Sequence, residues 1–284
     1  IDNIYDEVCG KGDSEPDSVS VTAMFKLALI QMRVEGGRRI ANLRRALGLI
    51  QQAADAGAKV VVLPETMDLG WTHGAARSEA GAVSSGDTCR HLCDAAQRHH
   101  LYLCAGLVER AGEQLFNAAV LIDPRGDVIL HHRKINELDI ARDLYAVGDR
   151  LRVVHTPLGT FGVMICADAF APGQVISRTL ALMGAQIILS PCAWAMPADH
   201  DNAQEPYGRL WLDNYCPVAM DFPLWIAGVS NVGWITDGPW QGRKCIGCSL
   251  LIAPGGEVAI QGPYGESAET ILYAEVELQP PAVR

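Results

Sequence analysis

Three reactive side chains each stand at the end of an apolar segment. Glu65 ends Val-Val-Val-Leu-Pro-Glu, Lys134 ends Val-Ile-Leu-His-His-Arg-Lys, and Cys166 ends Phe-Gly-Val-Met-Ile-Cys. Short apolar runs of this kind are typical of buried strands. Active-site residues are often found where such strands end and loops begin. The pattern therefore predicts that the three side chains share one site.

The three side-chain types complement one another chemically. A thiol with the ordinary pKa of about 8.5 is mostly protonated at neutral pH, so it needs a base or a nearby cation to act as a nucleophile. Glu65 can take the proton of the Cys166 thiol and later protonate a departing amine. Lys134 can stabilise the thiolate and the oxyanion of a tetrahedral intermediate. Because these groups suffice for acyl transfer, we expect no metal.

The segments around these residues resemble the signatures of the nitrilase superfamily of carbon-nitrogen hydrolases. The similarity is carried by LPET-x-x-x-G-W at 63–71, HHRK at 131–134 and GVMICAD at 162–168, with weaker matches at 116–126 and 247–256. It spans about residues 25–278. The resemblance implies a four-layer αββα sandwich, a triad of Glu65, Lys134 and Cys166, no cofactor, and a homodimer or higher homo-oligomer joined through the helical face around the cysteine.

The family often has a second active-site glutamate in a loop after the lysine, and a glycine closes that loop. Gly148 matches this glycine, but the matching glutamate position falls near Ala141, where the chain has no glutamate. Glu137, three residues after Lys134, is the nearest candidate for the second catalytic glutamate.

The residues after the nucleophile favour an amide over a nitrile. Nitrile-cleaving relatives often have tryptophan and glutamate there, whereas this chain has Ala167 and Asp168. We expect hydrolysis of a non-peptide C–N bond in a small amide-like substrate through a Cys thioester, with release of ammonia or an amine. Two alternatives stay open: nitrile hydrolysis to acid and ammonia by the same triad, and a non-catalytic binding or scaffold module of the same fold.

Aromatic residues near the signatures are candidates for an apolar substrate pocket. We expect Trp71, Asp168 and Trp194 to contact substrate, and Trp211 and Phe170 could join the pocket, although each aromatic residue could equally pack in the core. In relatives that bind a substrate carboxylate, a basic residue commonly follows the nucleophile motif. This chain has Ala169 and Phe170 there, which disfavours a carbamoyl amino acid substrate.

The elements that must position these residues alternate along the chain. Strands are predicted at 25–31, 59–64, 101–108, 114–122, 127–132, 161–166, 186–189, 225–229, 246–252 and 271–278, and helices at about 40–54 and 87–99. Turns at Pro124–Gly126 and Pro254–Gly256 indicate antiparallel hairpins. We therefore predict one carbon-nitrogen hydrolase domain over 25–284. Residues 1–24 hold six acidic residues against one lysine and are predicted to be an extension outside the domain.

Composition narrows the possible partners and the compartment. The net charge of −10 argues against nucleic acid and against anionic membranes, so the expected partner is a small-molecule substrate. Nine scattered cysteines and no visible signal or membrane segment favour a cytoplasmic location. We interpret Cys245 and Cys248 as core residues and the adjacent His131 and His132 as ordinary polar positions of a strand.

Overall fold

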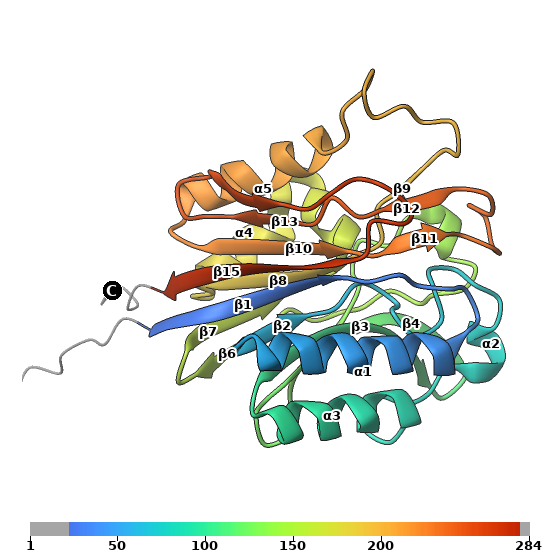
Figure 1. The fold of residues 1–284 in the computed structure, drawn as a ribbon, viewed down its shortest axis with the longest axis horizontal. Helices are drawn as coiled ribbons and strands as arrows, with labels where there is room; N and C mark the ends of the chain where they lie inside the picture. Colours follow the sequence, from blue (N-terminus) through green and yellow to red (C-terminus); the bar gives the residue numbers. More distant parts are fainter. Residues whose placement is uncertain (1–22, 279–284) are drawn as a thin grey trace, which may run out of the picture.

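The computed structural model of the protein describes residues 23–278, and in these residues two stacked β-sheets lie between two layers of helices (Figure 1). This arrangement confirms the predicted αββα sandwich. The extension predicted at 1–24 lies outside the described residues except for Ala23 and Met24. These two residues pair with Leu278 and Glu277, so the first strand begins two residues before the predicted start of the domain.

The first sheet has six strands in the described chain, and its centre is parallel. In spatial order the strands are β15 (Thr270–Leu278), β1 (Ala23–Gln31), β2 (Val60–Val62), β3 (Tyr102–Ala111), β4 (Gln114–Ile122) and β5 (Val128–Arg133). Strands β1, β2 and β3 are parallel, and β15, β4 and β5 each pair antiparallel with a neighbour. The predicted hairpin at Pro124–Gly126 joins β4 to β5, with Gly126 at φ +86 in its turn.

The second sheet repeats this plan within the described residues. Its strands in order are β14 (Val258–Gln261), β13 (Leu250–Ile252), β10 (Trp225–Ser230), β8 (Ile187–Cys192), β7 (Gly159–Val163) and β6 (Val153–Thr156). Strands β7, β8 and β10 are parallel, and the predicted hairpin at Pro254–Gly256 joins β13 to β14. A small sheet is formed by β11 (Val232–Trp234), β12 (Lys244–Ile246) and β9 (Ala195–Met196).

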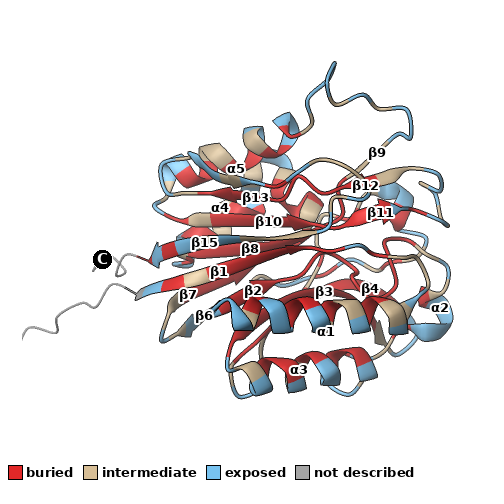
Figure 2. Ribbon diagram, in the orientation of Figure 1, coloured by how far each residue is buried: buried red, intermediate tan, exposed pale blue. Residues whose placement is uncertain are grey.

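Helices cover the outer faces of both sheets. They are α1 (Arg39–Asp55), α2 (Ala76–Glu79), α3 (Asp87–His99), α4 (Val175–Leu182) and α5 (Arg209–Asp221), with short 3-10 turns η1 (Asp139–Ala141), η2 (Cys166–Phe170) and η3 (Pro172–Gln174). Helices α1 and α3 pack on the first sheet, and α4 and α5 pack on the second. A further apolar layer of buried residues fills the space between the sheets, and buried residues dominate the central strands of both sheets (Figure 2). No helix within residues 23–278 is long and apolar enough to cross a membrane.

One predicted strand is wrong in the structure. The segment 246–252 divides into β12 and β13, which belong to different sheets. Gly247 and Cys248 both have positive φ at the break, and a side chain at position 247 would lie 2.2 Å from Nε2 of Gln31. The side chain of Gln31 instead accepts a hydrogen bond from the Ser249 N–H at 3.0 Å. Both Cys245 and Cys248 are buried, which agrees with core packing.

The ends of four strands converge on one region. Strand β5 runs in the same direction as β2, because two antiparallel pairings through β4 separate it from β3. Glu65 and Lys134 therefore emerge at the same edge of the first sheet. Cys166 follows β7, and Trp194 follows the parallel strand β8 in the second sheet. The predicted site thus lies where the carboxyl ends of strands from both sheets meet.

Candidate active site

Glu65 lies at the centre of a buried polar cluster and is 1% exposed. Its Oε1 accepts hydrogen bonds from Nζ of Lys134 at 2.7 Å and from Nδ2 of Asn117 at 2.6 Å. Its backbone N–H donates to the carbonyl of Cys192 at 3.2 Å, which ties the first sheet to the second. On β3, a Cβ at position 106 would lie 2.6 Å from the Cα of Glu65. The backbone at Glu65 can therefore pack this closely on β3 only because residue 106 is glycine.

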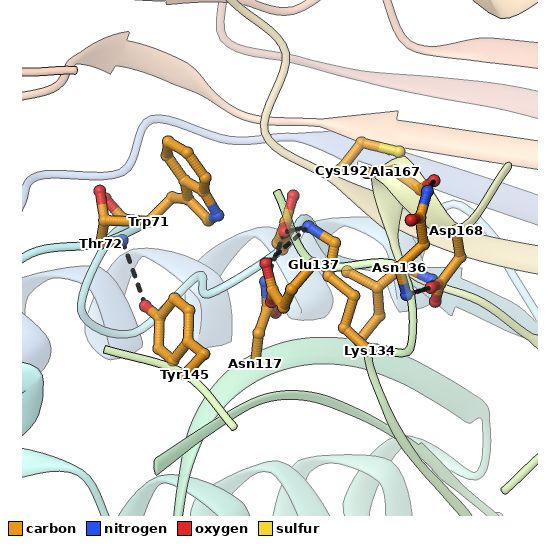
Figure 3. Close-up of polar contacts among 12 residues, drawn as sticks. Trp71, Thr72, Asn117, Lys134, Asn136, Glu137, Tyr145, Ala167, Asp168 and Cys192 are labelled. Atoms are coloured by element: carbon orange, nitrogen blue, oxygen red, sulfur yellow. Dashed lines mark hydrogen bonds and ion pairs between the residues drawn. The ribbon is translucent and has the colours of Figure 1, made fainter. Parts of the chain in front are cut away.

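Lys134 is a buried cation held between two carboxylates (Figure 3). Its Nζ lies 2.7 Å from Oε1 of Glu65 and 3.7 Å from Oε2 of Glu137. Burial alone would lower the pKa of Lys134. The negative charges of Glu65 and Glu137 outweigh burial and hold the pKa well above 10.5. The ammonium is therefore charged at neutral pH.

The loop after Lys134 places Glu137 beside the lysine. The N–H of Gly148 donates to the Lys134 carbonyl at 2.8 Å and closes this loop. A Cβ at Gly148 would lie 2.0 Å from the carbonyl oxygen of Arg133, so only glycine permits this approach. Ala141 is buried in η1. Glu137 thus occupies a position suited to a second catalytic carboxylate, which stays a prediction.

Burial raises the pKa of Glu137 to about 7, although the ammonium of Lys134 opposes the rise. We expect Glu137→Gln to gain stability relative to wild type as pH rises. Between pH 4.5 and 7 the folded protein keeps a proton on Glu137 that the unfolded chain has released. The contribution of Glu137 to the free energy of unfolding is therefore full below pH 4.5 and is lost as the pH rises to 7. A pKa rise of this size corresponds to about 3 kcal/mol.

Urea unfolding of both proteins from acid to neutral pH measures this effect. The free energy of unfolding of Glu137→Gln minus that of wild type should increase across this window. Groups that titrate in both proteins cancel in the difference. A difference that does not change with pH would contradict the buried, protonated Glu137.

Cys166 begins η2 directly after β7 in a sharp turn. Its φ is 44, in the left-handed region that residues with side chains rarely adopt. The residue is half-buried, and it lines a cavity together with Glu65 and Lys134. Burial raises the pKa of its thiol well above the ordinary value; Cys192 and Glu65 raise it further, and Lys134 only partly opposes them. The resting thiol is therefore neutral and requires a base at the moment of attack.

Asp168 does not have the predicted place in the substrate pocket. It is fully buried and is absent from the described lining of the cavity. Its Oδ1 accepts hydrogen bonds from the N–H groups of Ile135 at 3.0 Å and Asn136 at 2.7 Å, and its Oδ2 accepts one from Ile165 at 2.9 Å. Because these bonds occupy both oxygens, Asp168 connects the lysine loop to the cysteine turn and leaves no oxygen for substrate.

His132 completes this connection and is not the ordinary polar position that we predicted. It is 3% exposed, and its Nε2 lies 2.8 Å from Oδ2 of Asp168. Asn136 adds a second link, because its Nδ2 donates to the carbonyl of Ala167 at 2.7 Å (Figure 3). Lys134 precedes Ile135 and Cys166 follows Ile165, and the N–H groups of both isoleucines donate to Asp168. Asp168 therefore fixes the positions of Lys134 and Cys166 relative to each other.

We expect Asp168→Asn to lower kcat by about 100-fold with little change in KM. The amide keeps the shape of the carboxylate but places an NH2 group against backbone donors or against His132, and leaves at least one donor unpaired. Steady-state ammonia release measures both constants. Thr160→Val, a buried change on β7 away from this network, controls for general destabilisation. Normal kcat in Asp168→Asn would contradict the positioning role.

The cavity has a volume of about 160 Å³ and is mainly apolar. Its aromatic lining residues are Trp71, Phe170, Trp194, Tyr207, Trp211 and Trp240. The rings of Trp194 and Trp211 stack with centroids 4.5 Å apart, and those of Trp71 and Trp240 lie 4.9 Å apart. The two tryptophans predicted to contact substrate, Trp71 and Trp194, therefore both line the cavity beside Cys166. Their contact with substrate stays a prediction.

Sequence reasoning missed several residues of this site. Asn117 appeared only as part of a secondary signature, yet it donates to Glu65 from the buried face of β4. Tyr207 and Trp240 lie in loops outside every signature, and Tyr207 accepts a hydrogen bond from Nε1 of Trp211 at 2.6 Å. The one signal for Asn117 in the sequence is that it is a polar residue within an otherwise apolar predicted strand. Within residues 23–278 no group of three or more His, Cys, Asp or Glu side chains is arranged to hold a metal ion.

Comparison with protein families tests the resemblance directly. The family model described as carbon-nitrogen hydrolase matches residues 26–280. The chain belongs to this family. Among similar curated proteins, a nitrilase of Pyrococcus abyssi is 34% identical over 260 residues, with 90% of each chain covered. An omega-amidase of Danio rerio is 31% identical over 269 residues, with 90% of this chain and 89% of the relative covered.

Solved structures agree on the fold. Nit3 of Saccharomyces cerevisiae, a member of branch 10 of the nitrilase superfamily, matches with a TM-score of 0.76 and 24% identity over 91% of each chain. An amidase of Nesterenkonia sp. AN1, whose structure shows acrylamide added at the active-site cysteine, matches with a TM-score of 0.73 and 19% identity over 89% of this chain and 93% of that chain. The family member described here is a cysteine-dependent carbon-nitrogen hydrolase. The non-catalytic alternative is therefore set aside.

Proposed function

We propose that the protein hydrolyses the C–N bond of a small primary amide through a thioester on Cys166 and releases ammonia. The observation that carries this proposal is the arrangement around one cavity: a neutral thiol, a carboxylate and a permanently charged ammonium line the same space. This set supplies a nucleophile, a base and an oxyanion stabiliser without further groups.

Acylation begins when the Glu65 carboxylate takes the thiol proton as the Cys166 sulfur attacks the amide carbon. A C–S bond forms, and the carbonyl electrons move onto oxygen, where the ammonium of Lys134 stabilises the negative charge. As this intermediate collapses, the C–N bond breaks and Glu65 returns its proton to nitrogen. Ammonia leaves, and the acyl group stays on sulfur as a thioester.

Deacylation uses the same groups with water in place of the thiol. Glu65 takes a proton from water, and the oxygen adds to the thioester carbon. The second tetrahedral intermediate breaks its C–S bond, and the proton on Glu65 returns to the sulfur. The carboxylic acid leaves, so one amide and one water give one acid and one ammonia. Glu137, held 3.7 Å from Nζ of Lys134, acts in this proposal through the lysine by helping to hold its ammonium in place.

A panel of small amides, each paired with its nitrile, tests the proposal by measuring ammonia and acid release. We expect kcat/KM to be higher for the amide of each pair. A nitrile first gives a thioimidate that must take up water before nitrogen can leave, and the small Ala167 beside Cys166 adds no group to direct that water. Faster turnover of the nitriles would replace the amidase proposal with a nitrilase one. Release of ammonia from neither class would refute both.

A further inference from the structure

The cavity beside Cys166 offers a substrate no free positive charge. Among the described residues that line it, Lys134 is the one Lys, Arg or His. Its ammonium already lies within hydrogen-bond distance of Glu65 and 3.7 Å from Glu137. Burial raises the pKa of the lining Tyr207 well above 10, so that phenol is neutral. A carboxylate on the substrate would therefore lose its water and meet the negative charge of Glu65, joined above pH 7 by that of Glu137, with no cation of its own.

The walls of the cavity favour apolar groups. The stacked rings of Trp194 and Trp211 form one aromatic group, and Phe170 joins it with its ring centroid 5.6 Å from that of Trp211. Trp71 and Trp240 form a second group. Ring faces of this kind bury hydrocarbon surface and stack with flat groups. The lining thus matches an acyl group that is flat or branched and carries no charge.

The size of the cavity matches a small acyl group. Its volume of about 160 Å³ lies below the roughly 300–1,000 Å³ of sites for drug-sized ligands. An engineered apolar cavity of about 150 Å³ in another protein holds one benzene molecule. The space therefore admits one six-membered ring or a branched chain of similar bulk.

We propose that the natural substrates are neutral primary amides with a single apolar acyl group of ring size, and that the site rejects amides that also bear a carboxylate. This inference rests on the proposed amidase function and adds the substrate class. The rejection follows from the charge around Lys134, and the preference follows from the aromatic walls.

Two amides of equal size separate charge from shape. 4-Methylpentanamide and succinamate have the same chain and the same number of heavy atoms, with an isopropyl group in one where the other has a carboxylate. We expect kcat/KM for 4-methylpentanamide to exceed that for succinamate by about 100-fold or more, and phenylacetamide to be turned over as well. Equal rates, or faster turnover of succinamate, would overturn the substrate class while leaving the amidase function intact.

A charge added at the rim tests the cause. Leu210 lines the cavity from α5 and is 51% exposed, so Leu210→Arg can be accommodated at the surface. We expect this change to raise kcat/KM for succinamate by about 10-fold relative to 4-methylpentanamide. Met220→Arg is the matched control, because Met220 is 67% exposed on the same helix and outside the lining. An unchanged ratio in Leu210→Arg would contradict exclusion by charge. Turnover of no amide, with Cys166 never acylated, would refute the amidase function and this inference with it.

Discussion

Cys166→Ala is expected to lower kcat/KM for amides by about 10⁴-fold or more while the protein remains folded. The mutant keeps the cavity, Glu65 and Lys134, but it has no atom that can form the thioester. The side chain is half-buried and small, so its loss should change the melting temperature by only a few degrees. Ammonia release gives the activity, and thermal unfolding gives the stability.

The matched control for this experiment is Cys93→Ala. Cys93 is another half-buried cysteine, but it lies on α3, on the outer face of the first sheet. We expect it to retain full activity. Activity within about tenfold of wild type in Cys166→Ala would end the thiol mechanism.

Lys134→Met is expected to remove activity and to destabilise the fold strongly. The change leaves Glu65 and Glu137 buried beside each other with no cation, which typically lowers the free energy of unfolding by about 3–5 kcal/mol. Loss of the oxyanion stabiliser should lower kcat by about 10³-fold or more. Urea unfolding and ammonia release at neutral pH measure the two effects. Lys26→Met, which removes an ammonium from the surface, should change neither by a comparable amount.

A triple variant separates the electrostatic cause from simple loss of packing. Lys134→Met combined with Glu65→Gln and Glu137→Gln removes both unpaired carboxylates, so much of the lost stability should return. Its activity should stay absent, because base and oxyanion stabiliser are both missing. If the triple variant were no more stable than Lys134→Met, the charge cluster would not explain the destabilisation.

The sequence identified the groups that do chemistry because each one interrupts an apolar strand. Glu65, Lys134 and Cys166 stand where β2, β5 and β7 end, and strand direction alone brings such ends together. The parallel cores of both sheets were predictable for the same reason, since buried central strands are continuous apolar runs. Helices α4 and α5 were missed; α5 contains Pro217, which argues against a helix in sequence reasoning.

Contacts between distant segments were beyond sequence reasoning. Asp168 looked like a pocket residue because it follows the nucleophile, but its partner His132 comes from β5 and draws its carboxylate into the core. The break between β12 and β13 packs against Gln31 in β1, whose side chain lies where a side chain at position 247 would be and accepts a hydrogen bond from the Ser249 N–H. In both cases the contacting residue, His132 or Gln31, is distant in the sequence, so the local sequence pattern could not predict the contact.

The thioester on Cys166 is the central claim, and acid-quenched mass spectrometry tests it most directly. The enzyme is mixed with the amide of the panel that it hydrolyses fastest, quenched within one turnover, and digested to peptides. The account predicts that the peptide containing Cys166 gains the mass of one acyl group, that hydroxylamine removes this mass, and that Cys166→Ala shows no adduct. Steady turnover with no acyl mass on Cys166, or with the acyl group on another residue, would contradict it.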